Sequence, residues 1–381
     1  MYQQSIVIIP AWYPIPSDPL AGIFIREQAR ALRAAGLNIS VFHVEESRFP
    51  KLQPSRVRFE LEEEVPTFRL SVWVPPKRLR PFRIYWLQQW DRLFLSYREK
   101  FGTDPILFHA HSFVGGAAAK YLSRRYHLPY VLTEHYSGFI SGRLPAHWKK
   151  DLPGIYGNAN RVIAVSRLLA DAMGGYASCV EVIPNPIDTA LFRPGSSRVI
   201  SPFFHMVNVG SLIPRKGQHI LLEALAQLPD RETVRLQIIG RGPSEHQLRA
   251  QVKALGLERQ VSFAGAVMPE QLVAILQQAQ LFVSVSHSES FGLVLTEALA
   301  CGLPVISTPT GIAKEVIDEK IGQIVKNSDE LITAIQRYRE GSRLHHPELA
   351  RQKVVSNYGR ERVTVRIMAI YQEIFDQMQR T

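Results

Sequence analysis

Short apolar runs alternate with stretches of helical spacing along the whole chain. Ten runs have the length and the β-branched content of strands, at 5–9, 38–44, 106–111, 130–133, 161–165, 180–183, 206–209, 236–239, 261–263 and 281–285. Apolar residues recur at three and four positions in 25–35, 217–227 and 243–255, which predicts helices. This alternation predicts mostly parallel sheets with helices on both faces, the α/β class.

Two α/β domains are expected from the same pattern. The segment 193–198 has the Pro, Gly and Ser content of a linker, and the strand–helix rhythm restarts after it. We therefore expect one domain at 1–193 and a second at 199–345. Beyond them, Ile367, Tyr371, Ile374 and Met378 recur at four, three and four positions, which predicts a long amphipathic helix at about 357–381 with one buried face.

Composition and charge narrow the class of protein. Hydrophobic residues are 46% and charged residues 21%, values that exclude a disordered chain, and no apolar run is long enough for a spanning helix. Two cysteines and an N-terminus without a cationic region favour the reducing cytoplasm. The net charge is +11, of which +8 lies in residues 1–193, so anionic partners are expected: nucleic acid, an anionic membrane or phosphorylated substrates.

One constellation carries most of the candidate chemistry. Glu289 follows the strand at 281–285, and a helix is expected from Gly292 to Cys301, capped by Ser288 or Ser290 and ended by Gly302. Glu297 is the one charged residue from 293 to 301, and a carboxylate is costly to bury there without partners. The helix N-terminus suits a phosphate and Glu297 a ribose. The alternative is structural, with Glu297 paired to a basic side chain and Glu289 solvated.

These residues resemble the donor-site signature of the retaining family 4 glycosyltransferases. The Glu-x7-Glu spacing, with Phe-Gly after the first glutamate and Glu-Ala-Leu-Ala-Cys-Gly-Leu-Pro-Val-Ile from the second, is quite specific. Individually weaker motifs agree in order over nearly the whole chain, with 45–105 the least matched: Gly22-Ile-Phe24, Phe108-His-Ala-His111, Thr133-Glu-His135, Ile163-Ala-Val-Ser166, Ile183-Pro-Asn-Pro-Ile-Asp188 with Phe192, and Val209-Gly-Ser-Leu-Ile-Pro-Arg-Lys-Gly217.

The resemblance implies a fold and a reaction. It implies the GT-B fold, two Rossmann-like domains facing each other across a cleft, with the C-terminal helix crossing back to the N-terminal, acceptor-side domain. It implies retaining transfer of a hexosyl or N-acetylhexosaminyl group from a UDP-, GDP- or ADP-sugar, without a metal or other cofactor.

The resemblance also assigns roles to matching residues. Glu289 would contact hydroxyls of the donor sugar, Glu297 would hold the ribose, and Lys216 with Arg215 would neutralise the leaving diphosphate. His135 would lie against the transferred sugar. The other donor-side positions are the first glycine-bearing loop, the turn after the strand at 236–239 and the amides at the start of the helix: Gly22, Gly240, Phe291, Gly292 and Leu293.

Two positions depart from the family pattern. Ser211 stands where an arginine is common, so a phosphate cation is missing or Arg215 replaces it. Arg241 stands where an aspartate is usual, in Gly240-Arg-Gly-Pro243, and is a second candidate for that cation. Both departures leave the glutamate pair intact.

His109 and His111 share one face of a strand, but no further ligand lies at metal-binding spacing, so we expect a structural role for them. The dinucleotide fingerprint fails after Gly242, and neither a P-loop nor a hydrolase elbow is found.

The segment 75–92 joins cations to aromatics. Lys77, Arg78, Arg80 and Arg83 stand beside Phe82, Trp86 and Trp90, a pattern typical of membrane-surface helices. The alternative is a helix whose aromatics pack on the N-terminal sheet. We expect a peripheral protein on the inner face of the membrane that acts on a lipid-linked or cell-surface polysaccharide precursor. Other hypotheses are a GT-B epimerase or phosphorylase, and a basic nucleic-acid-binding protein, although no nucleic-acid motif is present.

Overall fold

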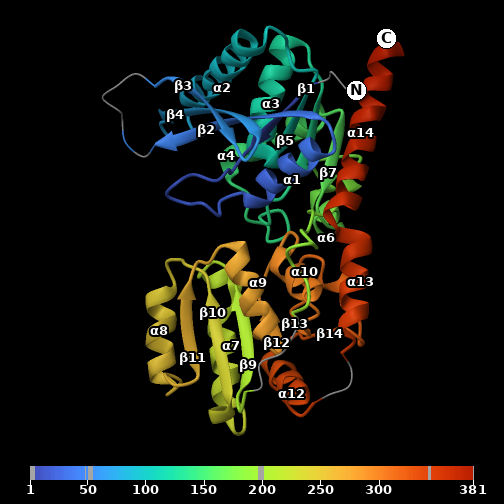
Figure 1. Cartoon of the computed structure of the whole chain (residues 1–381). Helices are drawn as coiled ribbons and strands as arrows, with labels where there is room; N and C mark the ends of the chain where they lie inside the picture. The colour runs from blue at the N-terminus through green and yellow to red at the C-terminus, as the bar shows by residue number, and fades with distance from the viewer. Residues whose placement is uncertain (1–4, 48, 50–54, 196–200, 342–344, 381) are drawn as a thin grey trace. The chain divides into compact units, whose positions relative to one another are not determined.

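The computed structural model describes residues 5–47, 49, 55–195, 201–341 and 345–380. The chain divides into two compact units (Figure 1). Unit 1 is Met1–Pro186 with Val363–Thr381, and unit 2 is Ile187–Arg362. We expected the first domain to end at residue 193, whereas unit 1 ends its first segment at Pro186. Positions 196–198 of the expected linker lie outside the described residues. Two parallel-sheet α/β units are what the sequence pattern predicts.

Unit 1 contains an eight-stranded sheet in the order β3-β4-β2-β1-β5-β6-β7-β8, parallel except for β3. Its strands are β1 (Ser5–Pro10), β2 (Asn38–Ser47), β3 (Val57–Glu62), β4 (Val65–Trp73), β5 (Leu107–His111), β6 (Tyr130–Glu134), β7 (Arg161–Ala164) and β8 (Glu181–Val182). All six strands expected in this half are present, and β3 and β4 are additional.

Helices cover both faces of this sheet. They are α1 (Ile23–Ala34), α2 (Arg80–Phe101), α3 (Ser112–Tyr126), α4 (Ala146–Lys149), α5 (Leu152–Tyr156), α6 (Arg167–Met173) and α14 (Arg360–Arg380). Ile6 and Ile8 of β1 share one hydrophobic core with α1 and α14. Phe108 of β5 meets Phe94 of α2 on the opposite face, since successive strand residues alternate.

The C-terminal helix α14 packs on unit 1, as the resemblance implied. Ile367, Tyr371 and Ile374 are at most 3% exposed within its core. Met378 was predicted for the same face, but it is 44% exposed, because the helix runs past the end of that core.

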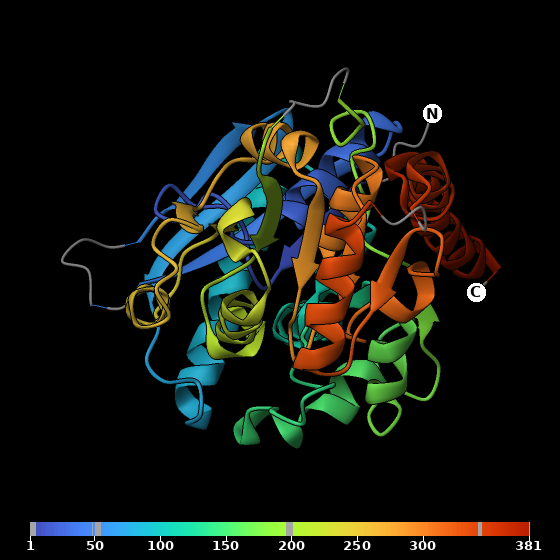
Figure 2. The same cartoon turned by 90° about the horizontal axis from the view of Figure 1, so that it is seen from below.

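Unit 2 contains a six-stranded parallel sheet in the order β11-β10-β9-β12-β13-β14. The strands are β9 (Phe204–Val209), β10 (Val234–Ile239), β11 (Val261–Gly265), β12 (Leu281–Ser284), β13 (Val305–Ser307) and β14 (Gly322–Ile324). The helices are α7 (Gln218–Gln227), α8 (Glu245–Ala254), α9 (Pro269–Gln278), α10 (Leu293–Ala300), α11 (Ala313–Val316), α12 (Ser328–Arg339) and α13 (Pro347–Tyr358). Helices α7 and α12 pack side by side (Figure 2), and α10 packs on α13.

Among the described residues, no helix combines the length and the apolarity needed to cross a bilayer.

Candidate functional site: a cation–carboxylate pair at the strand switch point of unit 2

The predicted donor-side residues follow two adjacent strands of unit 2. Strand β9 pairs with β10 on one side and with β12 on the other, so the strand order reverses between β9 and β12. The loops after both strands leave the sheet at its carboxyl edge. In open parallel sheets, ligands bind at this position.

Lys216 and Glu289 meet at this switch point, although 73 positions separate them in the chain. Lys216 Nζ lies 2.5 Å from Glu289 Oε1, and Arg215 lies 3.9 Å from the other carboxylate oxygen. Arg215 also donates to the Ser288 carbonyl at 2.5 Å, and the His287 amide donates to the Arg215 carbonyl at 2.8 Å. The two loops are thus joined, and they present two cations and one carboxylate together.

Two glycines allow the loops to approach this closely. Gly217 has φ 69°, and a Cβ there would lie 2.2 Å from the Val285 carbonyl oxygen. Gly311 has φ 56°, and a Cβ there would lie 2.0 Å from the Phe291 carbonyl oxygen. Both positions combine a left-handed backbone with a backbone neighbour that cannot yield, so a larger residue would move the loop that carries Glu289.

Helix α10 begins differently from the prediction. Its N-cap is Gly292, with φ 103° and no side-chain cap hydrogen bond, so neither Ser288 nor Ser290 occupies the cap position. Phe291 is 2% exposed, and its ring packs on Tyr358 at 6.0 Å between centroids. The amides of Phe291, Gly292 and Leu293 are at the free N-terminal end of α10, which favours an anion.

Glu297 lies in the second turn of α10 and is half-buried. Among the described residues, its carboxyl group forms no ion pair and no side-chain hydrogen bond, so the alternative in which it pairs with a basic side chain is wrong. Burial raises the pKa of Glu297 to about 7. Because no group of the described structure donates a hydrogen bond to it, the Glu297 carboxyl group can accept hydrogen bonds from ligand hydroxyl groups.

Ser211 and Arg241 are not part of the ion-pair cluster. Ser211 is exposed, and its carbonyl accepts from the Gln218 side chain at 3.2 Å. The Arg241 side chain is exposed and lies beside Gly265, while its carbonyl accepts from the Leu212 amide at 2.9 Å. Gly240 is fixed by packing, because a Cβ there would lie 1.9 Å from the Gly210 carbonyl oxygen. Of the two candidates for the missing cation, Arg215 alone contacts Glu289 in the described structure.

In unit 1, Gly22 caps α1 with φ 63°, and a Cβ there would lie 2.2 Å from the Trp12 carbonyl oxygen. The backbone therefore requires glycine at this position. Gly22 belongs to unit 1, whereas the other donor-side candidates belong to unit 2.

Three histidines form a stack at the carboxyl ends of β5 and β6. The His109 and His111 rings lie 4.5 Å apart and those of His111 and His135 lie 5.2 Å apart, both nearly parallel. His109 is held between Tyr371, at 2.5 Å, and Thr133, at 2.8 Å. This geometry agrees with the structural role expected for His109.

The outer end of the stack has unused hydrogen-bonding capacity. His111 Nδ1 lies 2.9 Å from His135 Nε2, so one ring donates to the other. Within the described chain, His135 Nδ1 and His111 Nε2 have no partner. Burial lowers the pKa of His135 to about 3, so its ring is neutral at physiological pH. His135 Nδ1 can therefore donate or accept one hydrogen bond to a ligand.

Glu134 is a buried residue that the sequence analysis missed. Its carboxylate accepts from the backbone amides of Phe113, His135 and Tyr136, each at 2.8 Å, and from the Tyr156 hydroxyl at 2.6 Å. It fixes the backbone that carries His135. A charged residue directly after an apolar strand was the available signal.

The aromatic face of α2 packs inside unit 1, so the prediction that Trp86 and Trp90 meet a membrane is wrong, and the alternative, in which they pack in the N-terminal unit, is confirmed. Trp86 and Trp90 are 1% and 2% exposed, and Phe82 is half-buried. Lys77 pairs with Glu46 at 2.5 Å, and Arg83 pairs with Asp151. The aromatic residues at 82, 86 and 90 are spaced by four positions and so share one helix face, which is buried in the core of unit 1. Arg78 and Arg80 remain exposed, as does the apolar side chain of Leu79.

Among the described residues, no group of three or more His, Cys, Asp or Glu side chains could hold a metal ion.

Two family models match the chain, one in each half. The model described as Glycosyltransferase Family 4 matches residues 21–191, and the model described as Glycosyl transferases group 1 matches residues 200–362. Together they span both units.

Two similar proteins are bacterial. A D-inositol 3-phosphate glycosyltransferase of Acidothermus cellulolyticus is 33% identical over 58% of this chain and 56% of its own length, so the match spans little more than half of that relative. TuaC of Bacillus subtilis, named as a teichuronic acid biosynthesis glycosyltransferase, is 29% identical over 91% of this chain and 92% of its own length.

Solved structures share the fold. A sucrose-phosphate synthase of Thermosynechococcus elongatus has a TM-score of 0.81 at 24% identity, covering 98% of this chain and all of that one. HepE of Anabaena, solved with UDP and glucose, has a TM-score of 0.73 at 20% identity and covers 99% of both chains. At these identities the likeness concerns the fold alone.

Proposed function

The chain belongs to the family 4 glycosyltransferases of the GT-B fold, and from that premise we propose that it transfers a sugar from a nucleotide-diphosphate sugar to an acceptor. The transferred group is a hexosyl or N-acetylhexosaminyl unit, and the anomeric configuration is retained. The observation that carries this proposal is the meeting of Lys216 and Glu289 at the β9–β12 switch point, with the uncompensated Glu297 on the following helix.

Each of these groups suits one part of such a donor. Lys216 and Arg215 supply the positive charge that a diphosphate leaving group needs as its negative charge develops. Glu289, once its cations turn to the diphosphate, accepts hydrogen bonds from sugar hydroxyls. Glu297 accepts hydrogen bonds from the ribose hydroxyls. UDP is a supported choice of nucleotide because HepE was solved with it, and GDP and ADP are the alternatives.

In unit 1, His135 contacts the transferred sugar through Nδ1, which has no partner in the described structure. Its depressed pKa makes it a neutral hydrogen-bonding group rather than a cation. With a neutral histidine and a cation-rich diphosphate site, the proposed reaction uses no metal and no cofactor. Proton transfer from the acceptor then goes to the leaving phosphate oxygen.

The proposed acceptor is a lipid-linked or cell-surface polysaccharide precursor, used at the inner face of the membrane. The positive excess of +8 in residues 1–193 supports an anionic surface as partner, now through exposed Arg78 and Arg80 rather than through inserted tryptophans. The similarity to TuaC supports a polysaccharide product.

The test is release of nucleoside diphosphate from UDP-, GDP- and ADP-sugars, with and without a lipid-linked oligosaccharide fraction, in the presence of EDTA. Transfer predicts release that requires the acceptor, persists in EDTA and forms a product with the anomeric configuration of the donor. Isomerisation of the donor without acceptor would indicate an epimerase, and release driven by inorganic phosphate would indicate a phosphorylase. Either result would contradict the proposal.

A further inference from the structure

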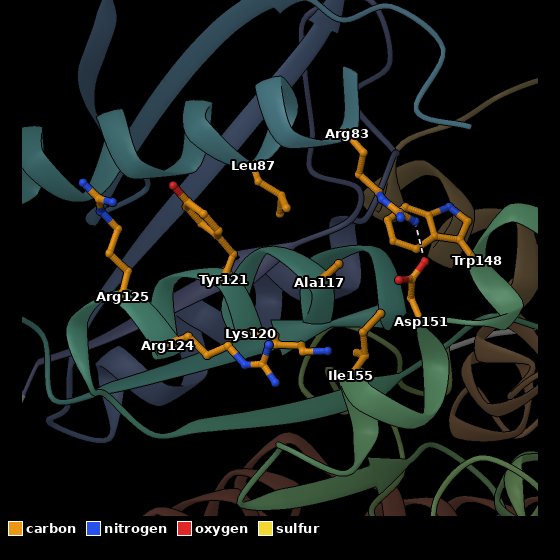
Figure 3. A pocket seen from close by; sticks show the side chains of 10 residues that line it. All are labelled: Arg83, Leu87, Ala117, Lys120, Tyr121, Arg124, Arg125, Trp148, Asp151 and Ile155. Atoms are coloured by element: carbon orange, nitrogen blue, oxygen red, sulfur yellow. Dashed lines mark hydrogen bonds and ion pairs between the residues drawn. The ribbon is translucent and has the colours of Figure 1, made fainter. Parts of the chain in front are cut away.

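A cavity of about 400 Å³ lies between α2, α3, α4 and α5 of unit 1 (Figure 3). Arg83 and Leu87 come from α2, and Lys120 and Arg124 come from α3. Lys120 lies eight residues after the start of α3, about 12 Å along the helix from the strand ends that carry His111 and His135. The cavity is therefore separate from the histidine stack.

Cations dominate the wall of this cavity, and two of them are already compensated. Four cations line it against one carboxylate, that of Asp151. Arg83 is paired with Asp151, and its guanidinium lies 5.6 Å from the centre of the Trp148 ring (Figure 3). Arg125 is paired at 2.9 Å with Asp91 on α2.

Lys120 and Arg124 form no ion pair in the described structure, and the carboxylate that acts on Lys120 is Asp151, which is already paired with Arg83. Lys120 is half-buried, and in the described structure it forms no ion pair and no hydrogen bond. Arg124 donates to the neutral Asn158 side chain at 3.3 Å. The two cations are one turn apart on one helix face, a like-charge spacing that destabilises a helix. Burial, and then the charge of Arg124, lower the pKa of Lys120. A bound anion would relieve both effects.

Tyr121 and four apolar residues form the rest of the wall. Ala117 and Leu87 face the cavity from α3 and α2, and the buried side chains of Trp148 and Ile155 close it from α4 and α5 (Figure 3). A ligand that fits this wall has a compact anionic group and a larger uncharged part. Beside Arg83, Leu79 at the N-cap of α2 and Ile84 in its first turns have apolar side chains that are about half exposed, at 51% and 46%.

We propose that this cavity binds a phosphate ester of an amphiphilic molecule, with the phosphoryl oxygens on Lys120 and Arg124 and the uncharged part against Leu87 and Trp148. A phosphoryl group has the several acceptor oxygens that an ammonium and a guanidinium fork can share. The exposed apolar side chains of Leu79 and Ile84 favour a lipid as the carrier of the phosphate. This inference does not depend on the donor-site assignment in unit 2.

The test is calorimetric titration of the full chain with dihexanoyl phosphatidate, a water-soluble lipid phosphomonoester, and with inorganic phosphate. Dihexanoyl phosphatidylcholine, which has no net charge, is the ligand control. The double variant Lys120→Met/Arg124→Gln should bind phosphatidate at least tenfold more weakly. Lys100→Met, which removes an exposed cation from the last turn of α2, should bind it like the unchanged protein.

Gly154→Ala tests the geometry without removing charge. An added Cβ would lie 2.6 Å from Lys120 Nζ, so the ammonium must move, whereas alanine is favourable in a helix. We expect weaker phosphatidate binding without a loss of thermal stability.

Three outcomes would overturn the proposal in whole or in part. Absence of phosphatidate binding, or binding that the double variant and Gly154→Ala leave unchanged, would overturn it whole. Equal affinity for inorganic phosphate and phosphatidate would overturn the lipid carrier and leave the phosphoryl site.

Discussion

The carboxyl group of Glu297 is a residue-scale feature that costs stability in the absence of a ligand. Its folded-state pKa of about 7 lies above the ordinary value of 4.5, and the cause is burial alone. Ionisation therefore opposes folding, and this loss of stability grows as pH rises from 4.5 to 7. A ligand that donates hydrogen bonds to the Glu297 carboxylate would offset this loss of stability.

Glu297→Gln should therefore stabilise the free protein and weaken the bound state. At pH 8 we expect the free energy of unfolding to rise by on the order of 1–3 kcal/mol, with little change at pH 4.5, where the glutamate is protonated. Donor affinity should fall about tenfold, because hydrogen bonds to the charged carboxylate are lost. Denaturant titrations at both pH values measure the first effect. A variant that is less stable at pH 8 would show that Glu297 has a stabilising partner.

The histidine stack makes the opposite contribution to pH dependence. Burial lowers the pKa of His109 and His135 to about 3 and that of His111 well below 6.5. Unfolding lets each ring bind a proton below pH 6.5, so stability is complete above that pH and is lost as pH falls. The slope is up to about 1.4 kcal/mol per pH unit for each histidine.

His111→Asn should lower the slope of unfolding free energy against pH, between pH 6.5 and 5, by about the contribution of one histidine. Unfolding free energies at several pH values measure the slope, whatever the variant's absolute stability. His127→Asn is the matched control, because His127 is exposed and has φ 57°, which asparagine tolerates. An unchanged slope in His111→Asn would mean that this ring binds protons in the folded state as readily as in the unfolded chain.

At the scale of elements, apolar strands were predictable and mixed ones were not. Strands β1, β5 and β6 are buried on both faces and read as apolar runs. Strand β3 is an antiparallel edge strand that mixes charged and apolar residues, and β13 and β14 are three residues each, too short for a pattern. Periodicity correctly indicated that α2 has an aromatic face, but periodicity cannot tell a bilayer from a protein core.

The candidate site was predictable only in part, because its contacts join residues that are far apart in the chain. Residue types and spacing singled out Glu289, in the loop before α10, and Glu297, on α10, but the contact of Glu289 with Lys216 spans 73 positions. Without the family resemblance, nothing in the chain indicates that pairing. The hydrogen bond between His111 and His135 likewise depends on the pairing of β5 with β6.

Helix α2 and the turn before it give a prediction that separates a buried aromatic residue from exposed cations. Trp90→Ala should lower the free energy of unfolding by about 3–5 kcal/mol, as expected for a large buried side chain. Arg78→Gln/Arg80→Gln should leave stability within about 0.5 kcal/mol and weaken binding to anionic vesicles roughly thirtyfold, because each cation contributes about 1 kcal/mol. Thermal unfolding and vesicle sedimentation measure the two effects. If Trp90→Ala left stability unchanged and abolished vesicle binding, the tryptophans would be membrane contacts and the burial assigned to them would be contradicted.

At the scale of the whole molecule, the last helix completes the first unit. Helix α14 supplies part of the core of unit 1, and the Tyr371 hydroxyl holds His109 across 262 positions. The C-terminal helix thus helps to fix the histidine stack that includes His135. The candidate site residues are divided between the units: the ion-pair cluster and Glu297 lie in unit 2, and the histidines lie in unit 1.

The central claim is that unit 2 binds a nucleoside diphosphate through Lys216. Its most direct test is calorimetric titration of the full chain with UDP, GDP and ADP and with the corresponding nucleosides. Lys216→Met is compared with the unchanged protein, and Lys253→Met, which removes an exposed cation from α8 of the same unit, is the control.

We predict that at least one diphosphate binds, that Lys216→Met weakens it tenfold or more while nucleoside affinity stays within twofold, and that Lys253→Met changes neither. Binding of no diphosphate, or an equal loss for nucleoside and diphosphate in Lys216→Met, would contradict the account.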